Sequence, residues 1–178
     1  DEGSIRKENP FVGQAGAREA MYIYGNCIPQ GMAKNPITGE IWAHEHGPKG
    51  GDEINIIKKG ANYGWPVVTY GIDYDGTTIS KESEKTGIEK PIYYWVPSIA
   101  PSGMTFVTSD KYPDWKGSLV VGSLKFEYLE LLKLKGNEVI ERQKIATGVG
   151  RVRNVVQGPD GYIYMGVEGK GIVKIIPN

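Results

Sequence analysis

One pattern recurs along the chain: a strand, a turn that contains proline and glycine, and an apolar strand that ends near an aromatic residue or valine. It occupies residues 30–42 and 154–164 and, more loosely, 103–120. The turn glycines Gly39, Gly117 and Gly161 are 78 and 44 residues apart. The shorter step is close to the roughly 40–50 residues of a four-stranded propeller blade, and the longer step has room for a blade plus a loop insertion near 58–100.

The remaining pattern predicts strands throughout. Short apolar runs with alternating or β-branched residues lie at 20–24, 40–44, 53–57, 92–95, 118–121, 129–134, 161–167 and 171–176. The chain has 25 glycines and 11 prolines, so turns are frequent, and only residues 9–20 have helical character. We therefore predict an all-β chain, either a partial β-propeller of about three four-stranded blades, which the repeat favours, or a β-sandwich. Propellers close with about four to eight blades, so three would not close alone.

Charge and apolar runs narrow the classes of partner. The 178 residues contain 21 Lys plus Arg and 21 Asp plus Glu, which gives no overall field to attract nucleic acid or an anionic membrane. No run approaches the ~18 apolar residues of a membrane span. The single cysteine, Cys27, cannot form an internal disulfide and is expected to be a small buried residue. Residues 1–7 have no apolar signal core, so we expect any export signal to have been removed or never present.

Residues 42–55 are the most informative stretch for chemistry. A strand ends there in a Gly/Pro loop, and a new strand begins at the adjacent carboxylates Asp52 and Glu53. Carbonyl and carboxylate oxygens can converge at such a loop on calcium, which takes six to eight oxygen ligands, although the two acids could equally be solvated loop charges. His44 and His46 share a strand face, but a zinc site lacks a third His or Cys ligand beyond Cys27.

Cationic and aromatic residues form two further candidate groups. Arg151 and Arg153 share one strand face, which suits a ligand with several carboxylates or is simply a pair of surface arginines. Lys125 follows the predicted strand 118–121, at a strand-end loop where propellers place ligand groups. Aromatic residues between glycines at 60–76 suit a flat ligand or a sugar, or a small satellite core under a long loop.

Several segments together resemble the soluble aldose sugar dehydrogenases of the glucose/sorbosone dehydrogenase family. They are Pro-Gln-Gly-Met at 29–32, Glu-His-Gly-Pro-Lys-Gly-Gly-Asp-Glu at 45–53, Lys-Gly-Ala-Asn-Tyr-Gly-Trp-Pro at 59–66, Tyr-Tyr-Trp at 93–95, Ser-Ile-Ala-Pro-Ser-Gly-Met at 98–104 and Arg-Val-Arg at 151–153. The resemblance implies a six-bladed propeller quinoprotein that uses pyrroloquinoline quinone (PQQ) and calcium. It covers this chain but only the C-terminal half of a family member, so residues 1–178 are expected to be that half.

The resemblance also implies roles for particular residues. The carbonyls of Gly47 and Pro48 would bind the calcium that bridges to the quinone, and Glu53 and Tyr63 would bind a second, structural calcium with Asp52 nearby. The positions expected to contact PQQ are Tyr74, Ser123, Leu124, Lys125, Arg151 and Arg153.

Two departures from the family pattern matter. Family members carry Arg-Asn before Pro-Gln-Gly, whereas this chain has Cys27-Ile28, and the catalytic histidine of the family belongs to the N-terminal half. We therefore expect part of a periplasmic or extracellular oxidoreductase that oxidises aldose sugars at C1, inactive without its N-terminal half. The alternative is a non-enzymatic calcium-binding or scaffold module with a decayed cofactor site. Either form would need a partner, the missing half or a second copy, to complete the propeller.

Overall fold

The computed structural model describes residues 3–177, and within this range the chain is built from strands and turns. One 3₁₀ turn, η1 (Pro113–Trp115), is the only helical element among these residues, and no described helix is long and apolar enough to cross a membrane. The strands are β1 (Ile28–Lys34), β2 (Ile41–His46), β3 (Asp52–Ile56), β4 (Tyr93–Trp95), β5 (Pro101–Phe106), β6 (Leu119–Ser123), β7 (Leu129–Lys135), β8 (Glu138–Ile145), β9 (Val152–Gln157), β10 (Ile163–Val167) and β11 (Gly171–Ile175).

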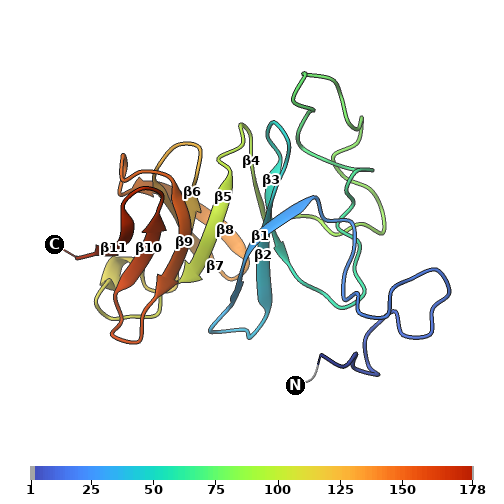
Figure 1. Cartoon of the computed structure of the whole chain (residues 1–178), viewed down its shortest axis with the longest axis horizontal. Coiled ribbons are helices and arrows are strands. Elements are labelled where there is room, and N and C mark those ends of the chain that lie inside the picture. Colours follow the sequence, from blue (N-terminus) through green and yellow to red (C-terminus); the bar gives the residue numbers. More distant parts are fainter. Residues whose placement is uncertain (1–2, 178) are drawn as a thin grey trace.

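The strands form three antiparallel sheets that follow one another along the chain (Figure 1). The first sheet has the order β1-β2-β3-β4, the second β5-β6-β7-β8 and the third β11-β10-β9. Strand β5 lies against β1 on one side and against β9 on the other. The sheets therefore stack face to face like consecutive propeller blades, which confirms the all-β prediction.

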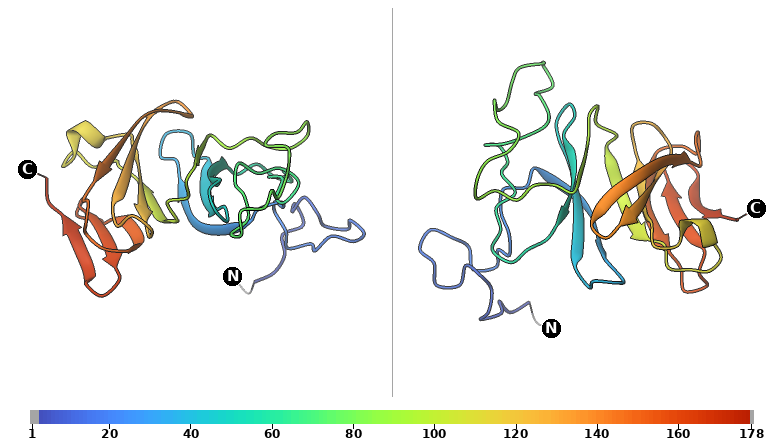
Figure 2. Two further views of the ribbon diagram at one scale, coloured as in Figure 1. Left: turned by 90° about the horizontal axis from the view of Figure 1, so that it is seen from above. Right: turned by 180° about the vertical axis from the view of Figure 1, so that it is seen from behind.

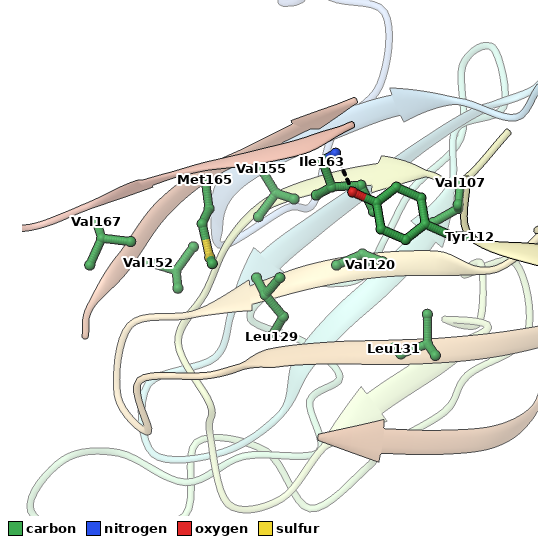
Figure 3. Close-up of a cluster of buried hydrophobic side chains, with 10 residues drawn as sticks. All are labelled: Val107, Tyr112, Val120, Leu129, Leu131, Val152, Val155, Ile163, Met165 and Val167. Carbon is green, nitrogen blue, oxygen red and sulfur yellow. Dashed lines mark hydrogen bonds between the residues drawn. The ribbon is translucent and has the colours of Figure 1, made fainter. Parts of the chain in front are cut away.

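Two hydrophobic cores hold the three sheets together. Between the first and second sheets, the rings of Trp42 and Phe106 meet edge to face at 5.2 Å. Between the second and third sheets, Leu129 and Leu131 pack with residues of β9 and β10 (Figure 3). Burial of each such side chain contributes about 1.5–3 kcal/mol. The second sheet is buried on both faces, and this explains why β6 reads as a continuous apolar run rather than an alternating one.

A tyrosine fastens the third sheet to the loop that follows β5. The hydroxyl of Tyr112 donates a hydrogen bond to the carbonyl of Ile175 at 2.6 Å. It accepts one from the N–H of Ile163 at 2.9 Å (Figure 3). Tyr112 is 3% exposed, so both bonds are shielded from water. They fix the position of β11 relative to β10.

Three details differ from the sequence-based expectations. The third sheet has three strands instead of four, because no strand among the described residues pairs with the outer edge of β11. The predicted strand at 20–24 was wrong: only Tyr24 forms a bridge, to Asn62, and the rest of the segment is turn, bend and irregular backbone. Strand β8 had no predicted counterpart, because its exposed charged face hides the alternation.

The N-terminal segment and the long loop between β3 and β4 lie together on the face of the first sheet that points away from the second (Figure 1 and Figure 2). Residues 57–92 contain no strand, and among them only Asn62 forms an isolated bridge, to Tyr24. Backbone hydrogen bonds join the two segments at Tyr24 and Ala61 (3.1 Å) and at Gly60 and Tyr22 (2.9 Å). The two segments therefore cover part of this face.

Candidate functional site

The buried carboxylate of Asp52 organises the loop between β2 and β3. Its Oδ1 accepts a hydrogen bond from the N–H of Gly47 at 2.9 Å, and its Oδ2 accepts bonds from the N–H groups of Ile99 and Ala100 at 2.7 and 3.1 Å. Asp52 is 0% exposed, and burial raises the pKa of its carboxyl against the lowering effect of these bonds. One side chain thus ties the loop before β3 to the loop before β5.

The Gly47-Pro48 turn is tightly packed but leaves oxygens free. A side chain on Gly47 would lie 2.1 Å from the carbonyl oxygen of Gly50, so only glycine fits. The carbonyl oxygens of Gly47 and Pro48 accept no hydrogen bond from the residues that the structure describes. Two free carbonyl oxygens are the donors that a hard cation such as calcium prefers.

Hydrogen bonds continue from this loop to the turn after β6. The N–H of Leu124 donates to the carbonyl of Ala100 at 3.0 Å, and that of Lys125 donates to the carbonyl of Ile99 at 3.2 Å. The hydroxyl of Ser123 donates to the same Ile99 carbonyl at 2.7 Å. The Gly47 loop and the Leu124 turn are therefore parts of one bonded assembly at the same end of the first two sheets.

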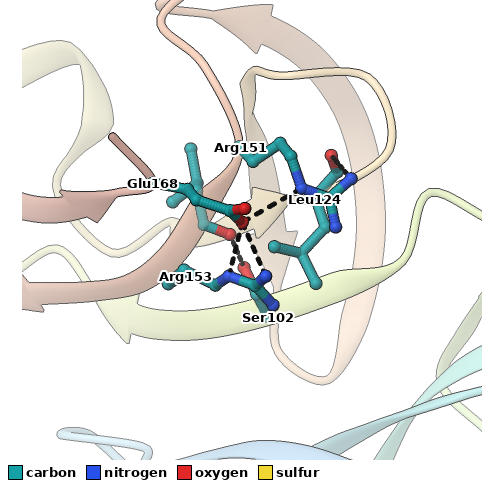
Figure 4. A network of polar contacts seen from close by, with 6 residues as sticks. Ser102, Leu124, Arg151, Arg153 and Glu168 are labelled. Carbon is teal, nitrogen blue, oxygen red and sulfur yellow. Dashed lines mark hydrogen bonds and ion pairs between the residues drawn. The ribbon is translucent and has the colours of Figure 1, made fainter. Parts of the chain in front are cut away.

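The arginine pair joins this assembly through the third sheet. Arg151 Nη1 donates to the carbonyl of Leu124 at 3.3 Å. Arg151 Nε and Arg153 Nη2 both reach Glu168 Oε2, at 3.2 and 2.6 Å (Figure 4). Beneath them, the Ser102 hydroxyl donates to the carbonyl of Val152 at 2.6 Å, which joins β5 to β9.

Charge at the arginine pair remains positive. The two guanidinium groups and Glu168 carry one net positive charge, and Arg153 and then Arg151 lower the pKa of Glu168. All three side chains are about half exposed, so an incoming anion can reach them. Because each guanidinium has five N–H donors and Glu168 binds through one oxygen, donors remain for a carboxylate ligand.

The structure brings together five of the six residues expected to contact the quinone. Ser123 ends β6, Leu124 and Lys125 follow it in the turn, and Arg151 binds the Leu124 carbonyl beside Arg153. The ammonium group of Lys125 lies 5.2 Å from the centre of the Phe126 ring. Tyr74 is 71% exposed on the loop between β3 and β4, and no hydrogen bond or ring contact joins it to the other five within residues 3–177.

A second group of polar side chains lies on the opposite face of the first sheet. Trp42 faces the second sheet, so Glu45, three residues later, faces outward, and the strand register places it directly opposite Glu53. Glu45 Oε2 accepts a hydrogen bond from the N–H of Cys27 at 2.9 Å, and Glu53 Oε2 accepts one from Asn55 Nδ2 at 3.1 Å. Burial raises the pKa of each glutamate to about 7.

The donors around Glu53 fit a hard cation. Asn55 is 1% exposed, and its Oδ1 has no hydrogen-bond partner in the described part of the chain. The Tyr63 hydroxyl donates a hydrogen bond to the carbonyl of Ile56 at 2.6 Å and accepts one from the N–H of Lys58 at 2.9 Å. The hydroxyl is therefore occupied, and the backbone carbonyl oxygen is the atom of Tyr63 that could bind a cation. Asp52 points to the other face of the strand, so the structure does not bring the Asp52 and Glu53 carboxylates together.

Of the two histidines, His44 is buried and His46 is half-buried. His44 is 1% exposed, neither ring nitrogen has a hydrogen-bond partner among residues 3–177, and burial, with a smaller effect from His46, lowers its pKa to about 3. His46 Nε2 lies 2.6 Å from the carbonyl oxygen of Pro101. Within residues 3–177, no group of three or more His, Cys, Asp or Glu side chains is arranged to hold a metal ion.

Sequence reasoning missed three polar residues of these two groups. Glu168 lies on the turn after β10 and reaches back to both arginines, a contact made only by folding of the third sheet. Glu45 becomes a neighbour of Glu53 through the β2–β3 register, whereas Asn55, two residues after Glu53 on β3, lies on the same face of that strand. The alternation of Glu45 with the buried Trp42 was the one sequence feature that could have indicated the face of Glu45.

Comparisons with known proteins give a consistent picture. The model of the glucose/sorbosone dehydrogenase family matches residues 1–174. Aldose sugar dehydrogenase YliI of Escherichia coli (strain K12) is 47% identical over 168 residues, which cover 93% of this chain and 45% of that protein. The chain thus spans about half the length of the curated relatives it matches.

Solved structures of related enzymes share the fold. A crystal structure of glucose dehydrogenase superposes with a TM-score of 0.95 at 42% identity, covering 99% of this chain and 53% of that chain. The PQQ-bound form of an aldose sugar dehydrogenase from Streptomyces coelicolor superposes with a TM-score of 0.68 at 26% identity, covering 97% of this chain and 48% of that one.

Proposed function

Because the chain belongs to the glucose/sorbosone dehydrogenase family, we propose that it is the C-terminal part of a quinoprotein that oxidises aldose sugars at C1 with PQQ and calcium. The observation that carries this proposal is the bonded assembly that runs from the Gly47 loop through Asp52 and the Leu124 turn to the arginine pair. It links two free carbonyl oxygens and a cationic group at one end of the stacked sheets. A ligand that binds a cation at one side would be held near the carbonyl oxygens, and its carboxylates would bind the cationic group.

The residues of this chain would bind and orient the cofactor. Arg151 and Arg153 would hold carboxylates of PQQ by charge-assisted hydrogen bonds, and Lys125 would add a third cation. The carbonyls of Gly47 and Pro48 would hold calcium, with Asp52 fixing their loop. The chemistry supplied by the bound groups would be hydride acceptance from C1 of the sugar by the quinone and Lewis-acid polarisation by calcium.

The proton of the sugar hydroxyl needs a base from outside this chain. His44 is buried and His46 is held by the Pro101 carbonyl, so neither histidine is free to accept it. The base would come from the N-terminal half of the propeller, with which we expect this chain to associate. A periplasmic or extracellular location would suit such an enzyme.

The alternative is a non-enzymatic scaffold that retains only a calcium site. Two observations favour it: Cys27 and Ile28 replace the expected Arg-Asn pair, and Glu168 already binds both arginines. In that case the arginine–glutamate group would be a structural contact between β9 and the turn after β10. The two functions predict different behaviour toward PQQ.

Titration of the chain with PQQ, followed by fluorescence quenching with calcium present, separates them. A charge-assisted hydrogen bond contributes about 1.5–3 kcal/mol, so Arg151→Gln or Arg153→Gln should weaken binding about tenfold or more. Arg18→Gln, an exposed arginine of the N-terminal segment, is the matched control and should leave binding unchanged. Equal affinity for all four proteins, or no binding by wild type with or without the N-terminal half, would favour the scaffold.

A further inference from the structure

The pair of glutamates on the outward face of the first sheet has no cationic partner. Glu45 and Glu53 are 4% and 8% exposed, and they lie directly opposite each other on β2 and β3. No lysine or arginine forms an ion pair with either carboxylate within residues 3–177. Like charges directly opposite in an antiparallel pair are destabilising, and burial increases that cost.

A third buried oxygen completes the arrangement. Asn55 donates from Nδ2 to Glu53 Oε2 at 3.1 Å, so its amide group lies against the glutamate pair. Its Oδ1 accepts nothing from the described residues, although Asn55 is 1% exposed. An unpaired buried oxygen beside two unpaired carboxylates is costly in the absence of a cation, because each must give up its hydration.

The neighbouring groups neither neutralise this pair nor close it off. The hydrogen bond from the Cys27 N–H uses one oxygen of Glu45, and the thiol beside it supplies no positive charge. A pocket of about 510 Å³ is lined by Asn26, Glu45, Asn55 and Ile57 among others, so Glu45 and Asn55 lie at the wall of a space that opens to solvent. A cation therefore has an entry path.

We propose that Glu45 and the Asn55 side-chain oxygen are ligands, with Glu53, of a divalent cation bound on the outward face of the first sheet. The proposal rests on the calcium dependence in the proposed function and on the structural calcium that the family resemblance implies at Glu53 and Tyr63, and it adds two side-chain ligands to that site. Carboxylate and amide oxygens together with the Tyr63 carbonyl form a hard donor set, which favours Ca²⁺ over softer metals. A bound cation would attract both glutamate carboxylates and so offset the repulsion between them.

Calorimetric titration of the chelator-stripped chain with CaCl₂ at pH 8 tests this directly. Glu45→Gln and Glu53→Gln should each weaken Ca²⁺ binding at least about tenfold, and Asn55→Leu about threefold or more. Glu138→Gln, an exposed glutamate of β8, should bind like wild type. No Ca²⁺ binding by wild type would overturn the structural calcium as well, whereas binding lost in Glu53→Gln but unchanged in Glu45→Gln and Asn55→Leu would overturn the new ligands alone. Neither result depends on PQQ.

Thermal unfolding provides a second measurement on folded protein. In EGTA, Glu45→Gln should unfold at a higher temperature than wild type, because one of two repelling buried charges is gone. Added Ca²⁺ should raise the unfolding temperature of wild type but not of this variant. Glu138→Gln should respond to Ca²⁺ like wild type; an undiminished response in Glu45→Gln would overturn the proposal.

Discussion

Asp52 should be the most sensitive polar residue of the candidate site. Its carboxylate accepts three backbone N–H bonds, from Gly47, Ile99 and Ala100, and it is 0% exposed. A buried donor that loses its partner costs about 1–3 kcal/mol, so Asp52→Ala should lower the free energy of unfolding by about 3 kcal/mol or more. Asp52→Asn keeps one acceptor oxygen and removes a buried charge, so it should cost only about 1–2 kcal/mol.

Urea-induced unfolding of the two variants and wild type measures these differences. Asp110→Asn is the control, because Asp110 is exposed and solvent screens its ion pair with Lys116, so the substitution should leave the unfolding midpoint nearly unchanged. PQQ titration of Asp52→Asn should also show weaker binding, since the Gly47 loop loses its anchor to the loop before β5. A cost below about 1 kcal/mol for Asp52→Ala, or equal costs for Ala and Asn, would refute the reasoning.

Three further predictions concern the interior and the open edge of the fold. The pKa of His44 is about 3 in the folded chain against 6.5 for the free side chain, so its contribution to stability is full above pH 6.5 and is lost as pH falls toward 3. Wild type should therefore lose about 1.4 kcal/mol relative to His44→Leu between pH 7.5 and 5.5 in urea unfolding, and parallel pH profiles would contradict this. Gly31→Ala should destabilise by about 1–3 kcal/mol in the same assay, because its Cβ would lie 2.3 Å from His44 Nε2; an unchanged unfolding midpoint would show that the ring can move. Light scattering should show self-association of the isolated chain that Ile172→Lys reduces, since Ile172 is 81% exposed on β11, whose outer edge pairs with no strand among residues 3–177. A wild-type monomer at micromolar concentration would argue against association through this edge.

The turn residues and the spacing of Gly39, Gly117 and Gly161 were enough to predict an all-β chain of about three blades. Short apolar runs between turns leave little choice of secondary structure, because glycine and proline end each strand after a few residues. The resemblance likewise pointed to Arg151, Arg153 and Lys125, which the structure brings to one end of the stacked sheets.

Tertiary structure alone decided what each polar residue contacts. Asp52 and Glu53 are adjacent in sequence, yet alternation along β3 sends one to the loop before β5 and the other to the outward face. Glu45 becomes the neighbour of Glu53 through strand register, and Glu168 reaches the arginines across the third sheet. A sequence carries the local preferences that form strands and turns, but register and sheet stacking determine which distant side chains meet, because those contacts depend on the packing of the whole fold.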